Sequence, residues 1–282
     1  MTDTPQIFDR KILRQKNKRA AKNFDNHRFL YDFGFSQLED RLKIIKKDFK
    51  SIIQIGAFGH HINNALTLDS CSSLCPDIIA DEECLPFKEN SQDLIISNLN
   101  LHATNDLPGV LSQIKYALKP DGLFIASILG GETLYELRDV MQSVEIEHNS
   151  GITPRIFPFA DMQQMGALMQ RAGFNLPVID NEKVTVTYEE PFKLFHDLRY
   201  MGQSNIISTR RKNFTSRQFF MDVVQKYQDK YSEDDGRIVA TFEVIFILGW
   251  KPHDSQQKPL PRGSAKNRLA DALNTKEGNL PW

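Results

Sequence analysis

The sequence predicts an α/β protein whose core is a mostly parallel β-sheet with helices on both faces. From residue 51 to residue 128, short apolar runs alternate with polar loops and helical segments, which is the pattern of a parallel sheet. Residues 81–127 form one supersecondary pattern: an Asp-led turn, a strand, a loop, a helix, a Pro-Asp-Gly turn and a second strand. Two strands further along the chain would bring the sheet to seven strands.

The segment before the first strand, residues 10–50, is expected to be helical. Apolar residues recur there at intervals of four, three and four positions, at Leu38, Leu42, Ile45 and Phe49. This spacing places them on one helical face. Residues 10–28 are rich in Lys and Arg, which favours a solvated helix face, with a lid or a partner-docking arm as the alternative.

The first five strands and the helix between the fourth and the fifth follow in order. Strands are predicted at residues 51–55, 66–69, 77–80, 93–97 and 123–128, and a helix at residues 107–117. That helix ends at the turn Lys119-Pro120-Asp121-Gly122, because proline fixes φ and glycine permits a positive φ.

The second half of the chain is expected to complete the sheet. Helices are predicted at residues 134–144, 160–172, 191–201 and 216–229, and strands at residues 183–188 and 241–250. Gly173 is the stop signal of the second of these helices. The polar, proline-containing residues 251–282 predict an extended arm with a short helix. The expected division is a helical extension (1–50), a sheet domain with helical insertions after the fifth strand and before the last strand (51–250), and a C-terminal tail (251–282).

Composition narrows the classes of function. A net charge of -1 gives no global field for nucleic acid, and no apolar run approaches the ~20 residues of a transmembrane helix. The basic N-terminus lacks the apolar region of a secretory signal, with a transit peptide as the alternative. Three cysteines suit a reducing compartment. The expected location is the cytoplasm of a bacterium, or the mitochondrial matrix of a eukaryote.

No metal site is expected. Cys71 and Cys75 lie four positions apart, but no third cysteine follows at short spacing, and structural metal sites usually need four thiolate or imidazole ligands. Hydrolase and metalloprotease motifs of the types G-x-S-x-G and H-E-x-x-H are absent from the sequence.

Candidate binding residues follow the predicted strands, because open parallel sheets bind ligands at the carboxyl ends of their strands. Asp69 ends the second strand, where a carboxylate accepts the hydroxyls of a ribose; a turn aspartate is the alternative. Asp81 opens the loop after the third strand, where it accepts an adenine amine while the Glu82 backbone meets a ring nitrogen. His102 follows the fourth strand and is a candidate base or substrate contact, with a satisfied loop histidine as the alternative.

The loop after the first strand, in IIQIGAFGHHINNAL, departs from what a nucleotide cofactor needs. Glycine is required where backbone N–H groups approach a cofactor, since any Cβ intrudes. Only Gly56 and Gly59 are present, and Phe58, His60 and His61 add bulk. The sequence therefore predicts weakened or lost cofactor binding.

Two segments, ADEECLPFKENSQDLIISNLNLH and LKPDGLFIAS, resemble the class I methyltransferases that use S-adenosylmethionine. The opening, FDR…RQKNKRAAKNFDNHRFL, and the segment ATFEVIFILGWKPHDSQQKPLPRGSAKNRLADAL are similar to the complex I assembly factor 5 (arginine hydroxylase) group and its bacterial relatives. The resemblance covers nearly the whole chain.

This resemblance implies a Rossmann-like sheet with an antiparallel last strand and S-adenosylmethionine as the cofactor. It also implies a protein substrate, a quinone-module subunit of respiratory complex I, in which an arginine is hydroxylated. The cofactor contacts that it implies are Gln54, Gly56, Ala57, Asp69, Asp81, Glu82 and Asn98. It implies no catalytic residue. The chain departs from the family at Gln54, where an acid is usual, and at Phe58 and His60, where glycines are usual.

Three functions stay open. The first is a methyltransferase-fold enzyme, such as a protein-arginine hydroxylase in complex I assembly, which the near-complete resemblance favours. The second is a malonyl-acyl carrier O-methyltransferase, against which the C-terminal tail argues. The third is a cofactor-free assembly chaperone or binding protein, which the altered glycine loop supports. The oligomeric state does not follow from the sequence.

Overall fold

A computed structural model describes residues 6–148, 151–258, 263–264 and 268–275. Its centre is a seven-stranded sheet in the order β3-β2-β1-β4-β5-β7-β6. The strands are β1 Ile52–Ile55, β2 Ala65–Asp69, β3 Ile78–Ile79, β4 Gln92–Asn98, β5 Leu118–Leu129, β6 Asn175–Tyr188 and β7 Ile238–Trp250. Only β7 runs antiparallel to its neighbours, β5 and β6. The predicted α/β class, strand number and antiparallel last strand are confirmed.

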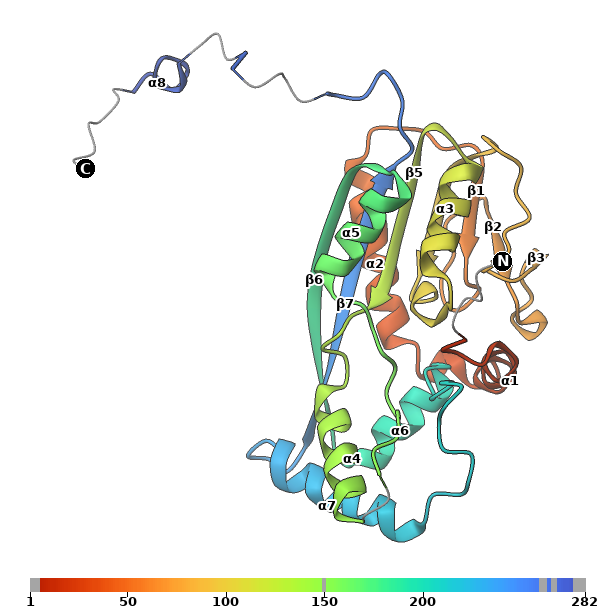
Figure 1. Ribbon diagram of the computed structural model, residues 1–282, viewed down its shortest axis with the longest axis vertical. Coiled ribbons are helices and arrows are strands. Elements are labelled where there is room, and N and C mark those ends of the chain that lie inside the picture. The colour runs from red at the N-terminus through yellow and green to blue at the C-terminus, as the bar shows by residue number, and fades with distance from the viewer. Residues whose placement is uncertain (1–5, 149–150, 259–262, 265–267, 276–282) are drawn as a thin grey trace. The chain divides into compact units, whose positions relative to one another are not determined.

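Helices flank the sheet on both faces (Figure 1). The helices of the main unit are α1 Arg10–Ala20, α2 Phe29–Ile44, α3 Leu107–Ala117, α4 Tyr135–Glu147, α5 Met162–Ala172, α6 Pro191–Tyr200 and α7 Arg217–Tyr231, and α8 Leu269–Ala272 belongs to a separate C-terminal unit. Three short 3-10 turns are η1 Phe24–Asn26, η2 Ser72–Leu74 and η3 Leu101–Ala103. Within the described residues, no helix has the length and apolar character needed to cross a membrane.

Local sequence signals set several helix ends. The Asp9 carboxylate accepts a hydrogen bond from the Ile12 amide at the start of α1, and Asp161 forms a reciprocal capping box with Gln164 at the start of α5. Such caps satisfy N–H groups that have no partner inside the helix, each contributing about 1 kcal/mol. Gly173, with φ +80°, ends α5 in the left-handed conformation, as predicted.

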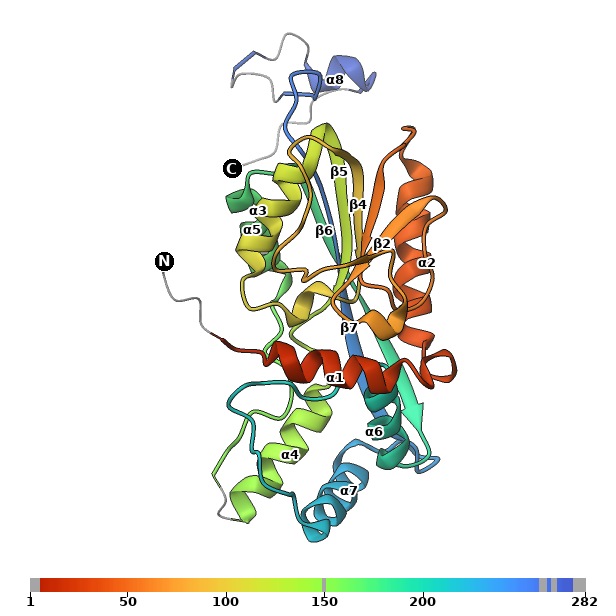
Figure 2. The same ribbon diagram turned by 90° about the vertical axis from the view of Figure 1, so that its right-hand side faces the viewer.

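Two apolar cores lie on opposite faces of the sheet. Helices α3 and α5 pack on one face through side chains that include Ile114 and Met165, both fully buried. Helix α2 covers the other face through Leu30 and Leu38, and Figure 2 shows the two layers on either side of the sheet. Burying each such side chain contributes roughly 1.5–3 kcal/mol, so the sheet is a rigid platform for the loops at its edge.

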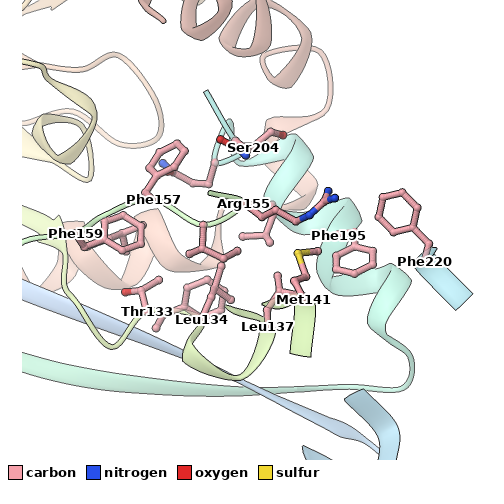
Figure 3. A pocket seen from close by; sticks show the side chains of 16 residues that line it. Thr133, Leu134, Leu137, Met141, Arg155, Phe157, Phe159, Phe195, Ser204 and Phe220 are labelled. Carbon is pink, nitrogen blue, oxygen red and sulfur yellow. The ribbon is translucent and has the colours of Figure 1, made fainter. Parts of the chain in front are cut away.

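The ribbon of β6 and β7 extends beyond the other strands and carries a helical lobe, which consists of α4, α6 and α7 (Figure 1). Its helices share one apolar core with α2 through residues such as Val140, Leu194 and Val223. The lobe and the segment 153–159 border a cavity of about 270 Å³, whose lining side chains are drawn in Figure 3.

Several boundaries differ from the predicted ones. Strand β6 begins at Asn175 rather than at residue 183, because it pairs with β7 over its whole length. The turn that was predicted before β5 lies inside that strand, where the pairing with β4 shifts its register. The residue with a positive φ in this turn is Asp121, at 62°, rather than Gly122. Helix α2 ends at Ile44, so Ile45 and Phe49 pack on the core from outside the helix.

The connection between β1 and β2 contains no helix. Residues 56–64 cross from one parallel strand to the next as a loop, whereas such crossovers usually carry one. Since this connection places no helix of its own over the carboxyl end of β1, that position is open to another part of the chain.

A separate unit, His253–Trp282, follows the main unit Met1–Pro252. The described part of this second unit contains α8, the short helix that the sequence predicted in the tail.

Candidate functional site

The carboxyl ends of β1 to β4 form the edge at which a ligand is expected. Helix α1 lies across this edge, between the sheet and the helical lobe, as Figure 2 shows. Most of the residues that the sequence singled out are therefore beneath or beside α1, and their partners decide what the site can bind.

Gln54, at 0% exposure, organises the loop after β1. Its side-chain Nε2 donates to the His60 carbonyl (2.9 Å) and lies 3.1 Å from His61 Nδ1, while its Oε1 accepts from the Ile62 amide (3.1 Å). A carboxylate at this position has no proton to donate to the His60 carbonyl. Glutamine in place of the usual acid is therefore matched to a compact loop.

The rest of the loop turns back onto the protein. Gly56 has φ +94°, and a Cβ there would lie 3.0 Å from the Asn100 side chain. Phe58 is buried, with its ring 4.6 Å from Phe24 and 5.7 Å from Tyr31 between ring centroids. The aromatic ring fills space that a glycine would have left empty, so the bulk noted in the sequence becomes packing.

Asp69 binds this loop instead of facing a cavity. Its two carboxylate oxygens accept from the backbone amides of Ala57 (3.0 Å) and Cys71 (2.7 Å). Burial raises the pKa of Asp69 to about 6, although both hydrogen bonds act to lower it. The predicted contact residues Ala57 and Asp69 thus contact each other, and Asp69 is only 3% exposed, which leaves its carboxylate little access to a ribose.

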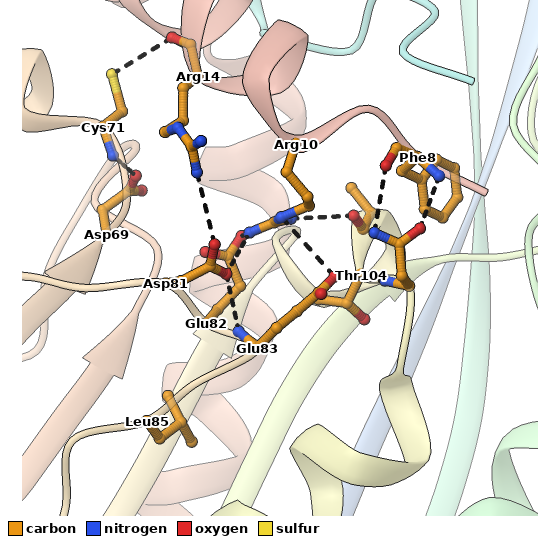
Figure 4. Close-up of polar contacts among 12 residues, drawn as sticks. Phe8, Arg10, Arg14, Asp69, Cys71, Asp81, Glu82, Glu83, Leu85 and Thr104 are labelled. Carbon is orange, nitrogen blue, oxygen red and sulfur yellow. Dashed lines mark hydrogen bonds and ion pairs between the residues drawn. The ribbon is translucent and has the colours of Figure 1, made fainter. Parts of the chain in front are cut away.

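The most conspicuous feature of the edge is an acidic cluster, Asp81, Glu82 and Glu83, around the guanidinium of Arg10 (Figure 4). Arg10 Nη2 lies 2.6 Å from Glu82 Oε1 and 2.9 Å from Asp81 Oδ1, and Nη1 donates to the Ala103 carbonyl at 3.1 Å. The Arg10 side chain is 11% exposed and that of Glu82 is 4% exposed. Burial acts to lower the pKa of Arg10, but the nearby carboxylates outweigh it and raise that pKa.

Helix α1 is held over the edge at further points. The Phe8 amide donates to Asn105 Oδ1 (2.7 Å) just before the helix, and Lys16 Nζ donates to the Asn205 carbonyl. Cys71 Sγ contacts the Arg14 carbonyl at 3.8 Å. These contacts come from three separate parts of the chain, so α1 is an integral part of the site.

The side chain of Asn98 is hydrogen-bonded inside the protein. Its Nδ2 donates to the Tyr31 carbonyl (2.9 Å) and its Oδ1 accepts from Ser127 Oγ (2.7 Å). This side chain therefore fastens α2 to β4 and β5, and its role as a ligand contact stays a prediction.

His102 is buried, and burial lowers its pKa to about 4. The imidazole is therefore neutral at pH 7 and does not titrate near neutrality. This differs from the candidate base that the sequence had suggested. Its Nε2 lies 2.9 Å from Gln203 Oε1, and Gln203 Nε2 donates to the Tyr31 hydroxyl at 2.9 Å. His102 Nδ1 and Asn100 Oδ1 have no hydrogen-bond partner among the described residues.

The space left between these groups is small. A cavity of about 20 Å³ is bordered by residues of α1, by Phe58 and by the loop of Asn100 and His102. This volume holds about one water molecule, whereas small-molecule sites occupy roughly 300–1,000 Å³. S-adenosylmethionine does not fit beneath α1 in this conformation, and the carboxylate expected to meet its adenine, Asp81, is paired with Arg10. No chemical step through this cofactor follows from the geometry.

Sequence reasoning missed two contributors, Arg10 and Gln203. The only signal for Arg10 was the basic character of residues 10–28, which a solvated helix face would explain as well. Gln203 lies in a loop without a motif. Conversely, the three cysteines are free thiols, and no group of three or more His, Cys, Asp or Glu in the described residues is arranged to hold a metal ion.

The site can now be compared with known proteins. A family model described as "Methyltransferase domain" matches residues 44–126. Zebrafish "Arginine-hydroxylase NDUFAF5, mitochondrial" is 38% identical over 287 residues, covering 94% of this chain and 89% of the relative. The chain belongs to the NDUFAF5 family. The human NDUFAF5 protein is likewise 38% identical, covering 93% of this chain and 82% of its own length.

The NDUFAF5 family lies within the wider methyltransferase fold. The malonyl-[acyl-carrier protein] O-methyltransferase of a Methylovorus strain is 29% identical over 89% of this chain and 92% of the relative. Among solved structures, the YcgJ protein of Bacillus subtilis superposes with a TM-score of 0.52 at 13% identity, covering 78% of this chain and 99% of that one. This last likeness shows the fold alone.

Proposed function

We propose that this protein is an assembly factor that binds an arginine side chain of a protein partner, a quinone-module subunit of respiratory complex I, and hydroxylates it. The observation that carries the proposal is the acidic cluster Asp81, Glu82 and Glu83, which encloses a guanidinium. Carboxylates recognise guanidinium groups through short, directional hydrogen bonds. Similarity to relatives named as arginine hydroxylases, over most of the chain, supports the same chemistry.

In this proposal Arg10 occupies the guanidinium site while no partner is bound. Displacement of α1 frees the cluster, and the partner's arginine takes the place of Arg10. Hydroxylation replaces a C–H bond by C–OH: one oxygen atom of dioxygen enters the substrate. The other leaves as water after uptake of an electron pair and two protons from an external donor.

Peptide binding tests the recognition step. An arginine-bearing peptide is expected to bind the Arg10→Ala variant more tightly than the unaltered protein, because the cluster is vacant. Its lysine counterpart is expected to bind more weakly, because an ammonium lacks the planar fork of the guanidinium. Equal binding of both peptides, or no gain in the variant, contradicts the proposed site.

Product analysis tests the chemistry. The protein is incubated or co-expressed with the complex I subunit, and the subunit's arginines are examined by mass spectrometry for the added mass of an oxygen atom. Glu82→Gln is expected to lower the yield, with Glu39→Gln, at the half-buried Glu39 of α2, as the matched control. If the peptide binds but no hydroxylated product forms, the proposed arginine-binding role stands and the proposed hydroxylase activity is wrong.

A second candidate, a cofactor-free assembly chaperone, is favoured by the cavity of about 20 Å³ where the cofactor is expected. Isothermal titration with S-adenosylmethionine and S-adenosylhomocysteine separates the alternatives. Micromolar binding that disappears in Asp81→Ala would show that α1 yields to the cofactor. Absence of heat at millimolar ligand, with the protein folded, supports the chaperone.

A further inference from the structure

A basic surface lies where α1 meets the connection between α6 and α7. Two stretches of the sequence come together there: residues 10–22, with seven Lys and Arg, and residues 198–217, with five, and neither contains Asp or Glu. The two stretches lie side by side (Figure 2), and a backbone bridge joins Phe8, just before α1, to Ile207. The fold therefore gathers positive charge that the sequence holds in two distant places.

Four cations form the centre of the basic surface: Lys16 and Arg19 of α1, Arg199 of α6 and Arg210 of the loop that follows α6. The side chains of Lys16, Arg19 and Arg210 each hydrogen-bond to an oxygen atom of residues 204–207, Arg19 at 3.5 Å and Arg210 at 3.0 Å. Arg199 adjoins them in the last turn of α6. The first three cationic groups are thus held on one short piece of backbone.

These cations are close enough to influence one another. The pKa of Lys16 is lowered to about 8, first by burial and then by the positive charges of Arg210 and Arg19. The pKa of Arg19 is lowered by burial and by the charge of Arg199. Like charges at short distance repel, so an anion placed among them would relieve this repulsion.

The protein itself provides little negative charge at the basic surface. Asp9 Oδ2 lies 3.6 Å from Arg210 Nη1, and its charge acts to raise the pKa of Lys16, against the stronger lowering effects. Within the part of the chain that the structure describes, Lys16, Arg19 and Arg199 have no carboxylate within 4 Å. The acidic cluster is bound by other arginines of α1. The basic surface therefore lacks a full set of counter-charges.

The distribution of charge favours a short acidic segment over a large polyanion. Outside the two basic stretches, the chain carries 23 Lys and Arg against 36 Asp and Glu, so a bilayer or a nucleic acid that extends beyond the basic surface would meet repulsion. Helix α1 has 11 residues and a length of about 16 Å. An extended peptide of about five residues spans the same length, and its carboxylates form charge-assisted hydrogen bonds with guanidinium groups.

We propose that the basic surface docks an acidic segment of a protein partner, about five or six residues rich in Asp and Glu, which lies in extended form along α1 with its carboxylates on the four central cations. This assigns the basic character of residues 10–28 to docking rather than to a solvated helix face. The proposal uses no carboxylate of the acidic cluster and no arginine of the partner, so it stands or fails independently of the function proposed above.

Peptide titration tests the docking. A hexapeptide of alternating Glu and Asp, which contains no arginine and carries a neutral fluorophore, is titrated with the full chain and followed by fluorescence anisotropy. Its counterpart of alternating Gln and Asn is expected to bind at least about tenfold more weakly, because it has no charge to pair with the cations. Raising the ionic strength from about 0.05 M to about 0.5 M is expected to weaken binding of the acidic peptide, because salt screens exposed charges.

Two variants locate the binding. Arg199→Gln, at an exposed side chain, is expected to weaken binding of the acidic peptide about fivefold, the effect of one exposed ion pair. Lys16→Gln/Arg199→Gln is expected to weaken it further. The matched control, Lys46→Gln/Lys50→Gln, removes two exposed lysines that follow α2 and is expected to leave the affinity unchanged. Circular dichroism shows that each variant is folded, and Arg199→Gln alone suffices if the double variant is not.

Two other polyanions are compared with the peptide: vesicles of phosphatidylglycerol and phosphatidylcholine, by cosedimentation, and a hexathymidylate, by anisotropy. Both are expected to bind more weakly than the acidic peptide at a matched concentration of negative charge. The proposal is overturned if the vesicles or the oligonucleotide bind at least as tightly as the peptide. It is also overturned if the acidic and amide peptides bind alike, or if the control variant loses as much affinity as Arg199→Gln.

Discussion

Replacing Arg10 by alanine removes the cation at the centre of the acidic cluster and tests whether α1 is held there by charge. The loss is expected to destabilise the protein, because Glu82 stays buried, with a side chain only 4% exposed, and has no other cation within 4 Å in the described structure. Breaking a buried pair by removing one partner costs about 3–5 kcal/mol.

The neighbouring carboxylates moderate this cost. Asp81 is 34% exposed and Glu83 is 23% exposed, so water can solvate them once the guanidinium has gone, and such pairs contribute only about 0–1 kcal/mol each. The Ala103 carbonyl also loses its donor. We therefore expect Arg10→Ala to lower the free energy of unfolding by about 3 kcal/mol.

Arg14→Ala is the matched control on the same helix. Its guanidinium lies 3.5 Å from Asp81, but the side chain is 44% exposed, so its removal should cost less than about 1 kcal/mol. Urea unfolding followed by circular dichroism gives the free energies of unfolding. Limited proteolysis at residues 10–20 shows whether α1 leaves the sheet before the sheet unfolds.

A double variant makes the reasoning refutable. Arg10→Met/Glu82→Gln removes both charges, so it is expected to recover more than half of the stability lost in Arg10→Met. The account is wrong if the two substitutions are additive. It is equally wrong if Arg10→Ala costs no more than Arg14→Ala and leaves α1 as resistant to protease as before.

Three further predictions concern the loop after β1. Gly56→Ala should destabilise by about 1–3 kcal/mol, measured by urea unfolding, because φ is +94° and the new Cβ meets Asn100 at 3.0 Å; an unchanged midpoint would contradict the strained conformation. The pKa of Asp69, raised by burial to about 6 from 3.8, makes the folded state hold an extra proton. Stability should therefore fall, by an amount of the order of 3 kcal/mol, as the pH rises from about 4 to about 6; Asp69→Asn should flatten this slope, and an equal slope in both proteins would refute the assignment. Gln54→Glu should cost about 1–3 kcal/mol in thermal or urea unfolding, because the His60 carbonyl loses its buried donor; Gln54→Met should cost a similar amount.

The sequence predicted the sheet well where a strand is defined by its own residues. The apolar runs that became β1, β4 and β5 are buried on both faces, so they stand out in the sequence. The first half of β6 mixes apolar residues, such as the exposed Leu176 and Val178, with polar ones and shows no buried face, and it is a strand because β7 pairs with it. A single sequence carries no signal for such partner-dependent pairing.

The candidate site was predictable to the extent that topology dictates it. Asp69, Asp81 and Glu82 lie at the carboxyl edge because parallel strands end there. What these carboxylates contact was not predictable, because Arg10 reaches Asp81 across 71 positions of the chain. The difference between an adenosine pocket and a guanidinium site depends on this long-range contact, which neither motif nor periodicity encodes.

The way in which α1 is anchored also sets an order of folding events. Helix α1 leaves the ribosome before the strands of the sheet, yet Lys16 binds a carbonyl 189 positions later in the chain, and the segment around Phe8 pairs with Ile207. Contacts of such high sequence separation form late, after the entropy of a long loop has been overcome. We therefore expect the sheet to form before α1 docks, so that, under the proposed function, a partner present during synthesis would meet the acidic cluster while it is still bare.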